Sequence, residues 1–533
     1  MFRPKIFRII RKLPICALAC ACVAAQNSAP SGTGDAAKDL GPLLQQFADV
    51  FSMVEAQAAS EPSSDKLIYE GAIPSMLRGL DPHTQFFDPG QFQQLKQMEE
   101  SEQKGFGSIV SVLPGQVIFL QTLPGTPSNR AGIQAGDELV AINNYSIHSL
   151  EVDQIIELLT QARQHKVVAT IRRQDKPKTL EFTLTPELVD SPSVDRAFML
   201  RPRFGYVRVA SWDMETASQL KSAIQKLGDE KLSGLVLDLR NNPGGIVQAS
   251  IASAALFLQP RQRILTAKGR AGKPEIADVP KGAQPYRFKL AILINEKTAS
   301  ASEIFAGALQ DHDRAEIVGE PSYGKGLVQS VLPLSDGAGL AITTAFYYTP
   351  SGRSIQRPIP NSALSGIFGA DTQAKTIVYK TDSGRTVTGG GGIRPDMEVA
   401  EAGHTRLEVV LDASGAITSF ATQYLSEHAG KVDNFEVTPA VLDEFHVYLA
   451  GRDIQPSVSE WSAESSWVGS RLKEEIVTLA RGVAKGDEVQ AQRDPQVQAA
   501  LQAVGGATEV TELQRTASGT LVAACRCERG RDF

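Results

Sequence analysis

Apolar residues recur at helical spacing near the start of the chain. One such pattern is formed by Leu43, Leu44, Phe47, Val50, Phe51 and Val54, which predicts an amphipathic helix. A second helix is expected over residues 67–80. It should end there, because Pro82 disfavours helical backbone at the preceding Asp81. Residues 26–38 are rich in Ser, Gly, Ala and Pro and are interpreted as a linker.

The pattern changes to short strand-like runs between about residues 105 and 187. The runs are 108–112, 117–121, 138–142, 167–172 and 180–184, and Pro-Gly or Gly-rich turns separate several of them. One helical pattern interrupts them at about 150–162. This stretch therefore predicts a compact β domain with little helix.

Strands and helices then alternate from about residue 203 to 400. Expected strands cover 206–210, 235–239 and 290–294, and expected helices cover 217–227, 246–258 and 301–309. Such alternation predicts an α/β layered structure. The chain after about residue 405 is mostly helical in pattern. The expected fold class is therefore multidomain α+β.

Composition and the ends of the chain narrow the class of protein. The 533 residues are 42% hydrophobic and carry a formal net charge of -6, which argues against a nucleic-acid partner. Basic residues from Arg3 to Lys12 precede an apolar run at 13–25, and this order predicts an export signal. An uncleaved anchor is the alternative. The five cysteines lie within 16–22 and 525–527, so the body offers no cysteine nucleophile.

Ser300 stands where a buried strand is expected to give way to a helix. A serine at a helix N-terminus lies beside unpaired N–H groups and the positive end of the helix dipole, which would stabilise negative charge near its hydroxyl. The alternative is an ordinary capping box, since Glu303 follows three residues later.

A serine nucleophile needs a base. His312 is the nearest histidine in sequence, but on a straight helix it would lie about 18 Å from Ser300. The distant candidates His83, His148, His404 and His428 stay open. Lys325, between Gly324 and Gly326, is favoured because burial can lower a lysine pKa enough to leave the amine neutral. The two glycines are expected to leave room for its side chain, and such a base predicts an alkaline pH optimum.

A nucleotide-binding alternative also fits part of this segment. Residues 319–325 match the spacing of a phosphate-binding loop, and the 235–238 run resembles an acidic strand of such enzymes. However, Gly326 stands where Ser or Thr would hold magnesium. The following residues 327–334 resemble a strand, where that loop requires a helix.

Several motifs in order resemble the carboxyl-terminal processing (tail-specific) serine peptidases. They are Leu80-Asp-Pro-His-Thr84, Asp238-Leu-Arg-Asn-Asn-Pro-Gly-Gly245, Ser300-Ala-Ser-Glu303, Gly324-Lys325-Gly326 with Gln329, and Gly392-Ile-Arg-Pro-Asp396. The resemblance covers about residues 66–400. It implies a crotonase-like α/β protease core with Ser300 as nucleophile, Lys325 as general base and Gln329 positioning the lysine. The implied oxyanion hole combines the Ala301 amide with an amide of the Gly244–Gly245 turn.

The β domain resembles a PDZ module. That resemblance implies that Gly105, Phe106 and Gly107 form a loop whose amides bind a terminal carboxylate, beside a groove walled by the helix at 150–162. Ser108 departs from the pattern, because an apolar residue is common at that position.

The expected domains are a signal peptide at 1–25, a linker and helical segment at 26–95, the PDZ domain at 96–190, the protease core at 191–402 and a helical extension at 403–533. The expected function is cleavage of exported polypeptides that have exposed apolar C-termini, most readily in the periplasm. No cofactor and no metal are expected. The alternative is an inactive tail-binding adaptor, and the extension is a candidate for adaptor binding or self-association.

Overall fold

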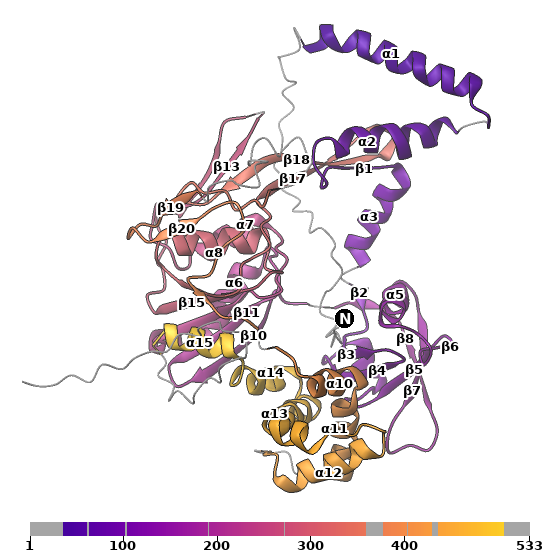
Figure 1. Cartoon of the computed structure of the whole chain (residues 1–533), viewed down its shortest axis with the longest axis vertical. Helices are drawn as coiled ribbons and strands as arrows, with labels where there is room; N and C mark the ends of the chain where they lie inside the picture. Colours follow the sequence, from indigo (N-terminus) through magenta and orange to yellow (C-terminus); the bar gives the residue numbers. More distant parts are fainter. Residues whose placement is uncertain are drawn as a thin grey trace, which may run out of the picture.

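The structure, a computed structural model, describes residues 36–60, 63–101, 104–189, 191–270, 272–358, 377–401, 403–428 and 435–505. The predictions for the signal peptide and for all five cysteines lie outside these residues. The described part confirms a multidomain α+β chain, with a β domain, a layered α/β core and a helical C-terminal region (Figure 1).

The N-terminal segment reaches from an outlying helix to the core. It contains α1 (Ala36–Gln57), a π-helical turn (Lys66–Ala72), α2 (Ile73–Arg78), β1 (Gln85–Phe87) and α3 (Pro89–Ser101). Both predicted helices are present, and α1 stands apart from the body of the molecule (Figure 1). The short strand β1 pairs antiparallel with β18 of the core, in the register Gln85 to Ala341.

The β domain is a six-stranded antiparallel sheet in the order β3-β4-β5-β7-β8, with β6 paired to β5. Its elements are β2 (Lys104–Gly105), β3 (Ser108–Leu113), β4 (Gln116–Thr122), α4 (Pro127–Ala131), β5 (Glu138–Ile142), β6 (Tyr145–Ser146), α5 (Val152–Ala162), β7 (Val167–Arg172), β8 (Leu180–Leu184) and β9 (Glu187–Leu188). The domain has its own apolar core, which includes Val112, Val117, Ile155 and Ile171.

The α/β core is built on a six-stranded sheet in the order β10-β11-β12-β15-β16-β21, which is parallel from β11 onward. These strands are β10 (Val194–Arg201), β11 (Phe204–Val209), β12 (Gly234–Asp238), β15 (Lys289–Ile294), β16 (Glu316–Gly319) and β21 (Met397–Glu398). Side chains alternate between its faces: Leu235 and Leu237 pack in one apolar cluster and Val236 in another.

Helices and a second sheet cover one face of this sheet. The helices are α6 (Thr216–Lys226), α7 (Val247–Ala254) and α8 (Ala301–Asp311). The second sheet runs β1-β18-β13-β14, with β17 paired to β18. Its core strands are β13 (Arg263–Gly269), β14 (Glu275–Asp278), β17 (Leu327–Pro333) and β18 (Gly339–Tyr348), and β19 (Val378–Lys380) with β20 (Thr386–Thr388) forms a separate hairpin. Helix α8 lies between the two sheets, so its N-terminus is enclosed by the core (Figure 1).

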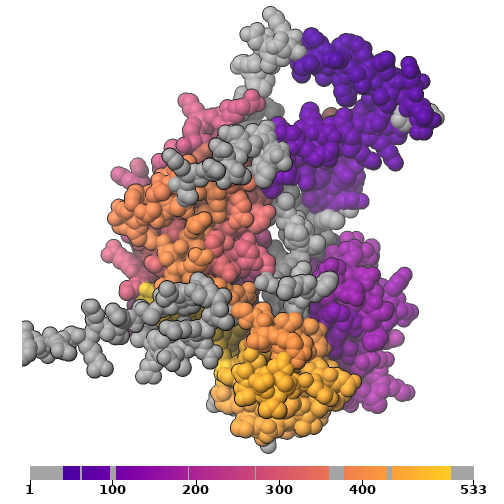
Figure 2. Space-filling model, viewed as in Figure 1, coloured from indigo at the N-terminus to yellow at the C-terminus, as the bar shows by residue number. Residues whose placement is uncertain are grey.

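The C-terminal helices form an arm that contacts both the β domain and the core (Figure 2). We call residues 403–505 the C-terminal arm. It contains α10 (Arg406–Ser414), α11 (Ala416–Glu427), α12 (Pro439–Ala450), α13 (Val458–Arg481), α14 (Val483–Ala491) and α15 (Pro495–Ala503). Ile109 and Leu120 of the β domain join the apolar core of α10–α13. Val497 and Leu501 of α15 cover the other face of the core sheet.

Candidate active site

Ser300 lies at the N-terminus of α8, in the loop that follows β15. Its backbone has φ of 55°, in the left-handed region that a residue with a Cβ rarely adopts. Such strained backbone persists only where the surrounding structure holds it, and it concentrates at functional sites. The side chain is buried, with 8% of its surface exposed. The predicted placement at a helix start is therefore confirmed.

Glu303 connects Ser300 to the loop that carries Lys325. This fully buried carboxylate accepts four hydrogen bonds. Its Oε2 accepts the backbone N–H of Ser300 at 2.8 Å and that of Lys325 at 2.9 Å. Its Oε1 accepts the Ser322 hydroxyl at 2.5 Å and the Gly324 N–H at 2.7 Å. The backbone nitrogens of Ser300 and Lys325 therefore lie within two hydrogen-bond lengths of each other.

Two effects oppose each other at the Glu303 carboxylate. Burial raises its pKa above the ordinary value, since a charged group loses its hydration. The hydrogen bonds from Ser322, Lys325, Gly324 and Ser300 lower the pKa in turn. The capping-box interpretation of Glu303 captured only the bond to Ser300. The three bonds to the lysine loop come from a segment about twenty residues later, so local spacing could not indicate them.

Lys325 lies in a loop between β16 and β17 and is half-buried. The flanking glycines allow another segment of the core to approach closely. A Cβ on Gly324 would lie 2.9 Å from the Cβ of Arg357, and one on Gly326 would lie 2.8 Å from the backbone nitrogen of Gln356. The space beside the two glycines is thus filled by the backbone at 355–357, and the expected room for the lysine side chain stays a prediction.

Gln329 follows on β17 with 5% of its surface exposed. Its Nε2 donates to the backbone carbonyl of His83 at 2.9 Å. Its Oε1 is buried and meets no donor among the described residues. Burial lowers the pKa of His83, and the positive charge of Lys325 lowers it further, while Asp81 opposes both. The N-terminal turn at 81–84 therefore lies beside the lysine.

The glycine turn at 241–245 packs directly against Ser300. A Cβ on Gly244 would lie 2.9 Å from the Cβ of Ser300, so this backbone can approach so closely only as glycine. The Gly244 N–H already donates to Oδ1 of the buried Asn242 at 2.9 Å. The N–H groups of Gly245 and Ala301 meet no acceptor in the described part of the chain. These two amides could therefore donate hydrogen bonds to a bound group.

An ion-pair network of Arg240 lies next to the glycine turn at 241–245. Arg240 binds Asp238 at 2.6 Å and Asp494 of the C-terminal arm at 2.7 Å. Burial would raise the pKa of Asp238, but the Arg240 charge and several hydrogen bonds outweigh it and hold that pKa below its ordinary value. The network lines a polar cavity of about 320 Å³, which neither Ser300 nor Lys325 lines.

Of the histidines considered as the base, His312 is engaged elsewhere, whereas His83 lies beside Lys325. His312 ends α8, where its Nδ1 bonds Asp382 and its Nε2 bonds the Arg263 carbonyl, each at 2.7 Å. The segment at 319–325 leads into strand β17. A phosphate-binding loop would lead into a helix, so the structure contradicts the nucleotide-binding alternative at this point.

The three residues expected to bind a tail carboxylate lie in the β domain, apart from Ser300 and Lys325. Gly105 ends β2, and Gly107 has φ of 72°, with the Thr126 side chain packed where a Cβ would stand. The Phe106 ring packs against the domain core. Strand β3 stands at the edge of its sheet, and α5 packs beside it. Ser108 at its start donates to Ser128 Oγ at 2.7 Å.

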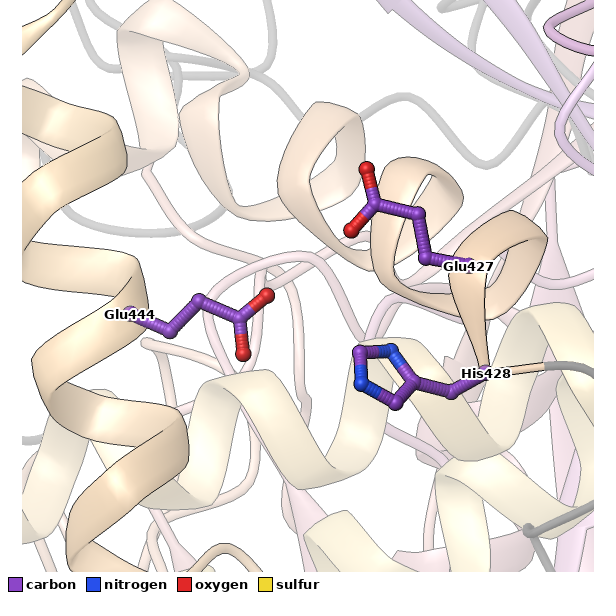
Figure 3. Close-up of side chains that lie close together, drawn as sticks. All are labelled: Glu427, His428 and Glu444. Atoms are coloured by element: carbon purple, nitrogen blue, oxygen red, sulfur yellow. The ribbon is translucent and has the colours of Figure 1, made fainter.

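One group of side chains in the described residues has metal-ligand character. Glu427, His428 and Glu444 place ligand atoms within 4.8 Å of one another, where α11 meets α12 (Figure 3). Imidazole and carboxylate ligands would suit Zn²⁺ or Mn²⁺. Both glutamates are exposed to water, and the cluster lies in the C-terminal arm, away from Ser300. It supplies no group to the site described above.

The chain is similar to known proteins of one peptidase family. The family model for peptidase family S41 matches residues 203–362, and a PDZ domain model matches 119–173. A carboxy-terminal-processing protease of Bartonella bacilliformis is 34% identical over 318 residues, spanning 59% of this chain and 72% of that protein. A carboxyl-terminal-processing protease of Synechocystis sp. is 37% identical over 292 residues, spanning 54% of this chain and 68% of that protein.

Two further likenesses come from photosynthetic systems. The chloroplastic carboxyl-terminal-processing peptidase 2 of Arabidopsis thaliana is 34% identical over 61% of this chain and 66% of that protein. A solved photosystem II D1 C-terminal processing protease is 25% identical, covers 67% of this chain and 92% of its own, and has a TM-score of 0.39. A search of the described helices finds none with the length and apolar character of a membrane span. The chain is a serine-type peptidase with a PDZ domain, and it belongs to the carboxyl-terminal-processing protease family, peptidase family S41.

Proposed function

We propose that this protein is an endopeptidase in which Ser300 is the nucleophile and Lys325 the general base. One observation carries the proposal: a single buried carboxylate oxygen, Glu303 Oε2, holds the backbone N–H groups of both residues. A catalytic pair must keep its geometry within a fraction of an ångström. The shared anchor provides that constraint for two residues that are twenty-five positions apart.

The chemistry follows from the groups around Ser300. The Ser300 hydroxyl attacks the peptide carbonyl carbon while the neutral Lys325 amine accepts its proton. The carbonyl oxygen becomes an oxyanion that receives hydrogen bonds from the Ala301 and Gly245 amides, each worth about 3–4 kcal/mol. The lysine then gives its proton to the departing amine, which leaves an acyl-enzyme. Water, deprotonated by the same lysine, releases the product by hydrolysis.

Gln329 supports the lysine in this scheme. Its buried Oε1 lacks a donor, and Lys325 stands four residues before it. An amine N–H directed at that oxygen would turn the nitrogen lone pair toward Ser300. The alkaline pH optimum expected for a neutral lysine stays a prediction.

Substrate capture is assigned to the PDZ domain. An extended tail would add as a strand to the unpaired edge of β3, beside α5, with its carboxylate on amides of Gly105, Phe106 and Gly107. The apolar Val152, Ile156 and Leu159 of α5 are only partly buried, which favours apolar tails. From the predicted signal peptide, we infer that the protein acts in the periplasm on exported substrates.

The test uses an unfolded substrate that ends in an apolar tail. Ser300→Ala and Lys325→Ala, made separately, should each lower kcat/KM on the order of 10³-fold or more, while tail binding to the PDZ domain persists. Cleavage at the wild-type rate by either variant would refute the dyad. Tail binding by the wild type without any cleavage would support the inactive adaptor instead.

A further inference from the structure

The turn at 81–84 is organised by one buried side chain. Asp81 has 2% of its surface exposed. Its Oδ1 accepts the N–H groups of His83 at 2.8 Å and Thr84 at 2.9 Å, and its Oδ2 accepts the Thr84 hydroxyl at 2.7 Å. A side-chain oxygen that binds the backbone two residues on defines an Asx-turn. The conformation of this turn is therefore set by Asp81.

The turn is fixed against the strands that follow Lys325. Strand β1 pairs with β18, and Thr84 Oγ1 accepts the N–H of Thr343 on β18 at 3.3 Å. Thr343 is the ladder partner of Gln329 on β17. The His83 carbonyl thus reaches Gln329 Nε2 at 2.9 Å from a rigid position.

This contact decides which way the Gln329 amide faces. A backbone carbonyl can only accept a hydrogen bond, so the NH₂ side of the amide must point at His83. The Oε1 side then points the other way, where it is buried without a donor among the described residues. Thr343 Oγ1, on the same face of the ladder, is also buried without a partner in the described chain. Gln329 Oε1 and Thr343 Oγ1 are therefore two buried polar atoms that could bind a polar group placed between them and the lysine loop.

We propose that Asp81 is a positioning residue for the peptidase: it fixes the His83 carbonyl, which orients the Gln329 amide so that Oε1 receives an N–H of Lys325. The inference rests on the proposed function, since it assigns a role only if Lys325 is the base. Asp81 itself touches neither substrate nor reacting atoms. Without the turn, the amide can reverse and present its NH₂ group to the lysine, where it would compete with Ser300 for the amine lone pair.

The experiment compares two substitutions at one position. Asp81→Ala removes both acceptors. Asp81→Asn keeps one side-chain oxygen, which is sufficient because both backbone N–H groups bind the same Oδ1. We expect Asp81→Ala to lower kcat about 10- to 100-fold with KM changed less than about twofold, since small misplacement of a catalytic group has effects of this size. Asp81→Asn should restore most of kcat.

Two further variants separate positioning from folding. Asp88→Ala is the matched control, because Asp88 caps the next element through Gln91 N–H at 2.8 Å and contacts no residue of the site; it should keep wild-type kcat and KM. The double variant Asp81→Ala with Gln329→Ala should be no slower than Gln329→Ala alone, since Asp81 acts through Gln329. Thermal unfolding of each variant establishes that it is folded.

The outcomes divide clearly. Wild-type kcat in folded Asp81→Ala, an equal loss in Asp81→Asn, or additive losses in the double variant would each overturn the proposal. If Asp81→Ala does not fold, Asp81→Ser takes its place, because the serine hydroxyl can accept one of the two backbone hydrogen bonds. The kcat of Asp81→Ser should lie between those of Asp81→Asn and Gln329→Ala. Wild-type kcat would again overturn the proposal. Cleavage by Lys325→Ala would instead overturn the proposed function.

Discussion

The serine and lysine of this protein meet through a third residue. The local sequence pattern does not identify Glu303 as a site residue, because its spacing from Ser300 is explained by a capping box. Its remaining three partners lie at 322–325. A fully buried carboxylate persists only when its lone pairs are satisfied, and here backbone and hydroxyl donors satisfy all of them. The residue therefore couples two loops that carry the proposed chemistry.

Replacing Glu303 by Gln should destabilise the site although the two side chains have the same shape. The amide has only one accepting atom, so its NH₂ group would face at least one buried N–H of this cradle. An unpaired buried donor costs about 1–3 kcal/mol, and kcat should fall because both loops lose their anchor. Urea unfolding and the cleavage rate measure the two effects.

Glu460→Gln is the matched control. Glu460 completes a capping box with Ser457 at the start of α13, but it lies at the surface, where water can replace a lost partner. Its effect on unfolding should be smaller and its cleavage rate unchanged. Equal destabilisation by the two substitutions would contradict the role given to the buried cradle.

At the scale of elements, the residue pattern found the longer strands of the β domain but only some of those in the core. Strands β5, β7 and β8 have the predicted bounds, and β12 and β15 lie within one residue of them. Strands β12 and β15 are buried almost throughout and leave apolar runs, whereas β5, β7 and β8 are buried only at some positions. Strand β10 was not singled out: it contains Asp195 and Arg196, which are buried through ion pairs with Arg208 and Asp487. Charges that are paired only in the folded state interrupt the pattern on which such a prediction depends.

The glycine turn after β12 packs against Ser300, and its role as an oxyanion hole stays a prediction. Its motif indicated an oxyanion hole, and Gly245 has an amide without an acceptor among the described residues. What the motif could not supply was the choice between the two glycines. That choice depends on the Asn242 side chain, which already binds the Gly244 amide.

Gly245→Ala should therefore disable catalysis. Gly245 has φ of 144°, and an added Cβ would lie 2.2 Å from the Trp212 carbonyl oxygen, so the turn must shift. Loss of one oxyanion donor costs about 10²–10³-fold in kcat. The control is Gly282→Ala in a core loop where a Cβ meets no atom within 4 Å. Unchanged kcat in Gly245→Ala would exclude this amide from the oxyanion hole.

At the scale of the whole molecule, the C-terminal arm was predicted to be helical but its position was not. Its apolar residues have helical spacing whichever surface they cover. Only the structure shows that Leu501 and Val497 pack on Val236 and Leu293 of the core sheet, while α10–α13 pack on the PDZ domain. The open face of the sheet and the apolar side of α15 are complementary parts of one core.

Detaching α15 should unfold more than one helix. Leu501 is fully buried, and Leu501→Ala should destabilise the protein by about 2–5 kcal/mol. Leu501→Met keeps the volume and should cost less than about 1.5 kcal/mol. Chemical unfolding followed by circular dichroism measures both. A loss for Leu501→Ala no larger than that for Leu501→Met would show that the arm does not stabilise the core.

The arm has one more consequence. The described chain contacts the core at β1, passes to the PDZ domain, returns to the core, packs on the PDZ domain again through α10–α13, and reaches the core once more at α15. These repeated passages restrict how the PDZ domain and the core can move relative to each other. If the PDZ domain binds a substrate's end as proposed, a constant separation between that domain and Ser300 predicts product fragments of constant length, whatever the sequence between.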